Sequence, residues 1–218
     1  MTQELWSTVD DYLTTTLSPD DAALEAARRR SDDAGLPPIA VAPNQGKLLY
    51  LLAKLAGARR ILEVGTLGGY STIWLARALP SDGELITLEF DAKHAEVARE
   101  NLAAAGLGDR VDIRLGLAAE TLPTLDGTFE FVFIDADKVN NPTYFTEALR
   151  LTKPGSVIVV DNVVRGGAVA DAASTDPAIL GIRRMNELIA NEPRVDATSL
   201  QTVGGKGYDG LTIALVVA

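Results

Sequence analysis

Two apolar segments of the chain end abruptly in oxygen-bearing side chains. Residues 131–138 read FVFIDADK, and residues 157–162 read VIVVDN. If the two segments are neighbouring strands of one sheet, Asp135, Asp161 and Asn162 converge at its carboxyl edge. Two carboxylates and an amide oxygen suit a hard divalent cation, Mg²⁺ first, with Mn²⁺ or Ca²⁺ as alternatives. The two aspartates could instead only cap the following helices, but the amide beside one and the lysine three residues after the other favour the metal site.

A glycine-rich segment follows an earlier apolar run, where residues 63–71 read EVGTLGGYS. Glycines at this position allow a tight turn and the close approach of a ligand to the backbone. Their spacing differs from the G-x-G-x-x-G of dinucleotide binding, which weakens the case for an NAD-dependent dehydrogenase. Glu89, at the end of the next run, is placed to hold a ribose diol. The alternative interpretations are a plain strand-to-helix turn and a solvated acid at Glu89. A site for a ribose but not for phosphate would fit S-adenosylmethionine (SAM), which has a ribose and no phosphate.

These residues need elements that bring them together, and the chain alternates apolar runs with helical patterns from about residue 59. The expected strands are 59–65, 84–90, 111–116, 129–136 and 156–162. The expected helices are 70–80, 94–106, 118–125, 143–151 and 177–191. A final hairpin is expected over 195–217. This pattern predicts an α/β fold with a mostly parallel sheet, helices on both faces, and ligands bound beyond the carboxyl ends of the strands.

The first part of the chain lies outside this alternation. We expect helices within 3–33, with Ser18-Pro19 as the N-cap and first residue of the second helix. A proline-containing loop is expected over 35–46, and then a helix up to Gly57. Residues 1–45 are therefore expected to form a helical cap or dimer contact on a single domain that spans residues 1–218. Near the other end, Tyr208-Asp209-Gly210 is predicted as the turn of the hairpin.

Composition limits the partners and the location. The chain has 218 residues, of which 47% are hydrophobic, and a formal net charge of −10. Such a charge disfavours nucleic acid and anionic membrane surfaces. The absence of cysteine excludes disulfides and thiolate chemistry. With no leader-like start and no apolar run of membrane-spanning length, we expect a cytoplasmic protein. The one histidine, His94, is expected at the surface, away from the site.

Four segments together resemble the cation-dependent O-methyltransferases, the group that contains the caffeoyl-CoA and catechol O-methyltransferases. They read EVGTLGGYS, ALPSDGELITLEFD, FVFIDADK and VIVVDNVVRGG. The resemblance extends from about Gly46 to the DGL motif at residues 209–211. It implies a Rossmann-like class I methyltransferase fold, with a seven-stranded sheet and an antiparallel C-terminal hairpin. It also implies a homodimer.

The resemblance also implies roles for single residues. SAM would be bound by Glu63, Gly65, Thr66, Ser71, Glu89, Ala118 and Asp137. The cation would be held by Asp135, Asp161 and Asn162, with Lys138 as general base and Asp135 beside it in the catalytic set. The acceptor would be a small aromatic molecule with two adjacent hydroxyls. Two alternatives stay open: an enzyme of this fold that methylates a natural-product hydroxyl without a catechol, and a SAM-binding protein without catalysis.

Overall fold

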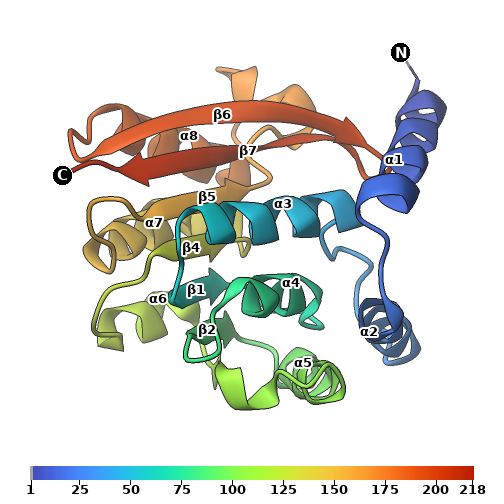
Figure 1. Ribbon diagram of the computed structural model, residues 1–218. Helices are drawn as coiled ribbons and strands as arrows, with labels where there is room; N and C mark the ends of the chain where they lie inside the picture. The colour runs from blue at the N-terminus through green and yellow to red at the C-terminus, as the bar shows by residue number, and fades with distance from the viewer. Residues whose placement is uncertain (1) are drawn as a thin grey trace.

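A single seven-stranded sheet organises the molecule in the computed structural model, which describes residues 2–218 (Figure 1). The strands are β1 (Arg60–Val64), β2 (Glu84–Glu89), β3 (Val111–Leu115), β4 (Phe131–Ile134), β5 (Val157–Asp161), β6 (Val195–Gly204) and β7 (Gly207–Val216). They follow the spatial order β3-β2-β1-β4-β5-β7-β6. Strands β1 to β5 pair in parallel, whereas β7 runs antiparallel to both of its neighbours. The predicted fold class is therefore confirmed.

Helices cover both faces of this sheet. They are α1 (Gln3–Leu17), α2 (Ala22–Asp33), α3 (Pro43–Leu55), α4 (Tyr70–Ala78), α5 (Ala92–Ala104), α6 (Ala118–Thr121), α7 (Asn141–Arg150) and α8 (Pro177–Ala190). Short 3-10 turns are η1 (Gly108–Arg110), η2 (Leu122–Thr124), η3 (Lys138–Asn140) and η4 (Arg165–Ala170). Helices α2 to α5 pack on one face and α6 to α8 on the other. No helix among residues 2–218 has the length and apolar character needed to cross a membrane.

The strand residues divide between two hydrophobic cores, one on each face. In β4, Val132 and Ile134 join the core under α7 and α8, whereas Phe131 and Phe133 join the core under α3 and α4. This alternation follows from the pleat, because successive side chains point to opposite faces. Strands buried on both faces are apolar throughout, and this is why the central runs could be recognised in the sequence.

Two helix boundaries differ from the sequence-based expectation. Helix α2 begins at Ala22, because Asp21 is its N-cap and accepts a hydrogen bond from the backbone amide of Leu24 at 3.1 Å. Ser18-Pro19 is not that start. Helix α3 begins at Pro43, within the expected loop, since proline at a first helical position lacks only an amide that would have no intrahelical partner.

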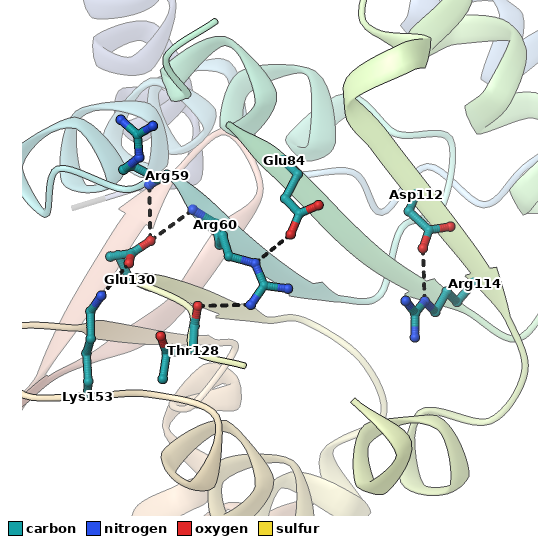
Figure 2. A network of polar contacts seen from close by, with 8 residues as sticks. All are labelled: Arg59, Arg60, Glu84, Asp112, Arg114, Thr128, Glu130 and Lys153. Atoms are coloured by element: carbon teal, nitrogen blue, oxygen red, sulfur yellow. Dashed lines mark hydrogen bonds and ion pairs between the residues drawn. The ribbon is translucent and has the colours of Figure 1, made fainter. Parts of the chain in front are cut away.

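The amino ends of the strands are tied by a network of ion pairs and hydrogen bonds (Figure 2). Glu130 precedes β4 and accepts hydrogen bonds from the backbone amides of Arg59 and Arg60, at 3.1 and 2.9 Å. Its other oxygen lies 2.7 Å from the Lys153 ammonium. Burial alone would raise the pKa of Glu130, but the ammonium and the two amides outweigh it and lower that pKa. Every acceptor oxygen of this carboxylate is thus used within the protein.

Candidate active site

Two adjoining cavities open at the carboxyl edge of the sheet. The strand order reverses between β1 and β4, the point at which such sheets bind ligands. The turn cavity, of about 580 Å³, is lined by the glycine turn after β1 and by the segments after β2 and β4. The hairpin cavity, of about 620 Å³, lies between the start of α3, the end of β5 and the β6–β7 hairpin. Both cavities are lined by Asn162 and Arg165, so they meet beside the end of β5.

Most of the predicted site residues line the turn cavity. They are Gly65, Thr66, Ser71, Glu89, Ala118, Asp135, Asp137, Lys138 and Asn162. Asp161 lines the hairpin cavity instead. Glu63 lines neither, because it is fully buried behind Ser71. The topology therefore brings together residues that are spread over about a hundred positions of the sequence.

The glycine turn brings the backbone close to the next strand. A Cβ atom on Gly65 would lie 2.3 Å from the backbone oxygen of Asp135, and the φ of Gly65 is +101°. No larger residue fits there without a shift of the backbone. The turn is tied to β2 by Glu89, whose carboxylate accepts hydrogen bonds from the backbone amides of Thr66 and Leu67, at 3.2 and 2.8 Å. The acid at the tip of β2 thus positions the turn as well as lining the cavity.

Glu63 lies under the turn in a fully enclosed polar pocket. Its carboxylate accepts hydrogen bonds from the hydroxyls of Thr72, Ser71 and Thr87, at 2.5, 2.7 and 2.7 Å. Burial raises the pKa of Glu63 to about 7, in spite of these three donors. The role predicted for this residue in cofactor binding would therefore act through Ser71, which does reach the cavity.

The acid-tipped strands bring Asp135, Lys138 and Asp161 together. The Lys138 ammonium lies 2.9 Å from Asp135 and its side chain is only 8% exposed. Asp161 is also buried, and one of its oxygens accepts a hydrogen bond of 2.6 Å from the Gln45 side chain. Burial, together with the negative charge of Asp135, raises the pKa of Asp161 to about 6. The helix-cap alternative fails for Asp161, because its side-chain bonds go to its own neighbour Asn162 and to Gln45 rather than to a following helix.

These residues also suit a cation. Two neighbouring carboxylates share one ammonium, so the local charge favours a further positive ion. Among residues 2–218 there is no cluster of three His, Cys, Asp or Glu side chains with metal-binding geometry. The candidate set is instead two carboxylates with the amide oxygen of Asn162, a donor type that Mg²⁺ and Ca²⁺ accept.

Backbone strain is concentrated at the same place. Among the described residues, the non-glycine positions with positive φ are Leu67 at 49°, Asn162 at 56° and Arg165 at 55°. All three line one or both cavities. Such conformations cost free energy and persist where the surroundings fix them, often at functional sites. Arg165 is fixed by Asp209, whose carboxylate accepts hydrogen bonds from the backbone amides of Val164 and Arg165, at 3.0 and 2.9 Å. Leu67 is fixed by the hydrogen bond from its own backbone amide to Glu89.

Several site residues were missed or misplaced by the sequence analysis. The hairpin turns at residues 204–207, so Asp209 lies within β7 and reaches the end of β5 instead of forming the turn. His94 is not away from the site: it lines the turn cavity, with Nδ1 3.6 Å from Glu89. Gln45 contacts Asp161 across 116 positions of sequence. Local sequence features could have indicated two of these residues, since Asp209 belongs to the DGL motif and His94 follows Glu89 by five residues. No local feature indicated Gln45.

Two further residues complete the far wall of the turn cavity. Asp137 accepts hydrogen bonds from Asn140, at 2.7 Å, and from the hydroxyl of Tyr144. Burial and the bond to Asp137 raise the pKa of Tyr144. Phe90 lines the same cavity and is 70% exposed, which offers an apolar surface to a flat ligand.

Known proteins match the chain over nearly its whole length. The sequence profile of the O-methyltransferase family matches residues 14–216. A catechol O-methyltransferase of Niastella koreensis is 52% identical over 220 residues, which cover 99% of this chain and 100% of the relative. A catechol O-methyltransferase of Mycobacterium tuberculosis is 54% identical over 209 residues, or 95% of this chain and 94% of the relative.

Solved structures match equally well. The O-methyltransferase from Bacillus cereus in complex with SAH has a TM-score of 0.97 and 54% identity, and the match covers 99% of this chain and 100% of that one. TomG from Streptomyces achromogenes, involved in Tomaymycin synthesis, was solved in complex with SAM. It has a TM-score of 0.97 and 52% identity over 100% of both chains.

Proposed function

Because the chain belongs to the O-methyltransferase family, we propose that it transfers the methyl group of SAM to one hydroxyl of a catechol-like aromatic acceptor. The turn cavity would hold SAM and the hairpin cavity the acceptor. The observation that carries this proposal is their junction, where Asp135, Lys138 and Asn162 line the same cavity as the glycine turn. A methyl donor and an acceptor bound on either side would meet there.

The cofactor would be held by residues that already face the turn cavity. Gly65 and Thr66 would approach it through the backbone, and Glu89 would accept from the ribose hydroxyls. Ser71, Ala118 and Asp137 would line the remainder of the site. A carboxylate has about four acceptor positions, and Glu89 already accepts hydrogen bonds from the backbone amides of Thr66, Leu67, Phe90 and Asp91. The ribose hydroxyls would therefore have to replace some of these bonds.

Asp135, Asp161 and Asn162 would hold a divalent cation, with Mg²⁺ as first candidate. Bound there, the cation would lower the pKa of an acceptor hydroxyl, which is about 10 for a free phenol. Lys138, in its neutral form, would take the hydroxyl proton on Nζ, and Asp135 would hold that amine in place. The acceptor oxygen would then attack the methyl carbon, and the C–S bond would break with its electron pair left on sulfur. Burial of these groups would exclude water and fix the approach.

Methyl transfer from labelled SAM to catechols and matched monophenols, with Mg²⁺ or with excess chelator, tests the proposal. We expect transfer to catechols only, and its loss with chelator. Transfer that is unchanged by the chelator would support methyltransferase activity and contradict the proposed role of the cation. Binding of S-adenosylhomocysteine without transfer to any acceptor would favour a protein that senses SAM.

A hydroxyl on a larger natural product is the second candidate acceptor. It is favoured by the relative TomG, which is involved in Tomaymycin synthesis. A panel that contains both simple catechols and larger hydroxylated aromatics separates the two candidates by kcat/KM. The cytoplasmic location expected from the sequence and the homodimer implied by the family resemblance remain predictions.

A further inference from the structure

The acids around the hairpin cavity already have partners within the protein. Asp10 accepts hydrogen bonds from the backbone amide of Gly205 and the side chain of Asn44, at 2.8 and 3.0 Å. Asp209 is occupied by backbone amides, and Asp161 belongs to the proposed cation site. A cation on the acceptor would therefore find no uncommitted carboxylate at the outer wall of this cavity.

The two basic side chains of the same cavity are differently placed. Lys206 donates to the backbone oxygen of Ala40, and no carboxylate among residues 2–218 lies within ion-pair distance of it. Arg165 likewise has no acidic partner in the described part of the chain. An ammonium has three donors, so Lys206 has two left for a ligand. The hydrogen-bond donors of this cavity that lack an acidic partner thus belong to two cationic side chains, Lys206 and Arg165.

Lys206 is held at a defined place rather than on a free loop. It belongs to the tip of the β6–β7 hairpin, which lies beside α1 (Figure 1). Gln3 donates to the backbone oxygen of Gly204 at 2.8 Å, and Asp10 binds the next amide. Two contacts from α1 therefore fix the tip that carries the ammonium.

The cavity between Lys206 and the end of β5 suits an aromatic ring. Apolar and aromatic residues line it, namely Ile39, Val41, Leu48, Tyr208 and Leu211. The charges of Asp135 and Asp161 act on the Lys206 ammonium and oppose the lowering of its pKa by burial. Lys206 and Asp161 line this same cavity. A ring with hydroxyls at Asp161 would point its opposite end toward the hairpin tip.

We propose that Lys206 binds a carboxylate on the acceptor, so that the preferred substrates are dihydroxybenzoates or dihydroxycinnamates rather than neutral catechols. This inference rests on the proposed function and adds the substrate class to it. A charge-assisted hydrogen bond from an ammonium is stronger than a neutral one. Because Lys206 is partly exposed, we expect a preference of about tenfold in kcat/KM, rather than the larger effect of a fully buried pair.

The test compares acceptors with the same catechol head and different tails. For 3,4-dihydroxybenzoate and its methyl ester, the kcat/KM ratio is measured in the wild type, Lys206→Met, Lys206→Arg, Arg165→Met and Lys93→Met. Lys93 is exposed on α5 and lines neither cavity, so its variant removes the same net charge elsewhere. Calorimetry of dihydroxybenzoate with S-adenosylhomocysteine and Mg²⁺ gives Kd independently of turnover.

We expect the wild type, Lys206→Arg and Lys93→Met to prefer the carboxylate about tenfold, and Lys206→Met to lose that preference. Equal rates for acid and ester in the wild type would overturn the inference and leave the methyltransferase intact. Loss of the preference in Arg165→Met, but not in Lys206→Met, would also overturn it. If no acceptor is methylated, the proposed function fails, and the calorimetric Kd decides alone: equal values in the wild type and Lys206→Met overturn the inference.

Discussion

The two ends of the same sheet treat their charged groups in opposite ways. At the amino edge, Glu130 is met by an ammonium and two backbone amides, and its pKa is lowered (Figure 2). At the carboxyl edge, Asp161 is buried beside the like charge of Asp135, and its pKa is raised to about 6. The first carboxylate is stabilised by the protein alone. The second is held in an environment that needs a further positive charge, and such imbalance is typical of functional sites.

The backbone shows the same difference. The strained non-glycine residues Leu67, Asn162 and Arg165 all belong to the carboxyl edge, whereas no described non-glycine residue at the amino edge has positive φ. Strain of this kind costs stability and is kept where a site needs a fixed geometry. The comparison therefore predicts that substitutions at the carboxyl edge affect activity most and that those at the amino edge affect stability most.

The largest expected effect on activity is that of Asp161→Ala. The variant removes one of two carboxylates from the proposed cation site, so we expect cation-dependent methyl transfer to be abolished. Binding of S-adenosylhomocysteine, measured by calorimetry, should largely survive, because Asp161 does not line the turn cavity. Asp112→Ala, at an exposed position of β3, is the matched control and should keep full transfer. Full activity of Asp161→Ala after removal of the metal would contradict the cation site.

A smaller loss is expected for Lys138→Ala. If Lys138 takes the acceptor proton, its removal should lower kcat by roughly two to four orders of magnitude. The readout that separates a base from a structural residue is the pH profile of kcat, measured in single turnover. The limb on which the wild-type rate rises with pH, as the base loses its proton, should disappear in the variant. A profile with the same limbs in both proteins would refute the role as base, whatever the size of the loss.

The contrast between the two edges was only partly visible in the sequence. The acids at the carboxyl edge follow apolar runs directly, so their convergence could be predicted from strand order alone. The DGL motif that contains Asp209 could be recognised in the sequence, but the contact that Asp209 makes could not be predicted. Its contact with the end of β5 depends on the antiparallel register that pairs Asp161 with Leu211, and local patterns do not determine that register.

Residues that act across long sequence separations were not predictable at all. Gln45 reaches Asp161 only because α3 packs over the end of β5, and Lys206 reaches the cavity only because α1 fixes the hairpin tip. At the amino edge, the hydrogen bonds of Glu130 could not be predicted, since an acidic residue before a strand is common at protein surfaces. The sheet and its helices follow from periodicity, but side-chain partners follow from packing.

At the amino edge the expected effect concerns stability. Glu130→Gln removes charge-assisted bonds from a carboxylate that is only 18% exposed, so we expect a loss of about 2 kcal/mol in unfolding free energy. For a chain of this size, that corresponds to a fall in Tm of about 4–8 °C at pH 7. Methyl transfer at a temperature where both proteins are folded should be unchanged.

The pH dependence of this loss has a definite sign. Folding lowers the pKa of Glu130 below its ordinary value of 4.5, so the carboxylate stabilises the fold above that pH. The contribution is lost as the pH falls through the folded pKa. The Tm difference between wild type and Glu130→Gln should therefore be full at neutral pH and shrink in acid below about 4.5. A difference that grows in acid would mean that the carboxylate is not stabilised by its partners.

The smallest effect is expected for Asp112→Ala, although its bond in Figure 2 is drawn like those of Glu130. The carboxylate of Asp112 lies 3.0 Å from Arg114, but the two side chains are 58% and 39% exposed. Water solvates both charges before and after the pair forms, so such a pair contributes less than about 0.5 kcal/mol. We expect the Tm to change by less than about 2 °C. A fall as large as that of Glu130→Gln would show that burial does not decide which ion pairs at this edge stabilise the sheet.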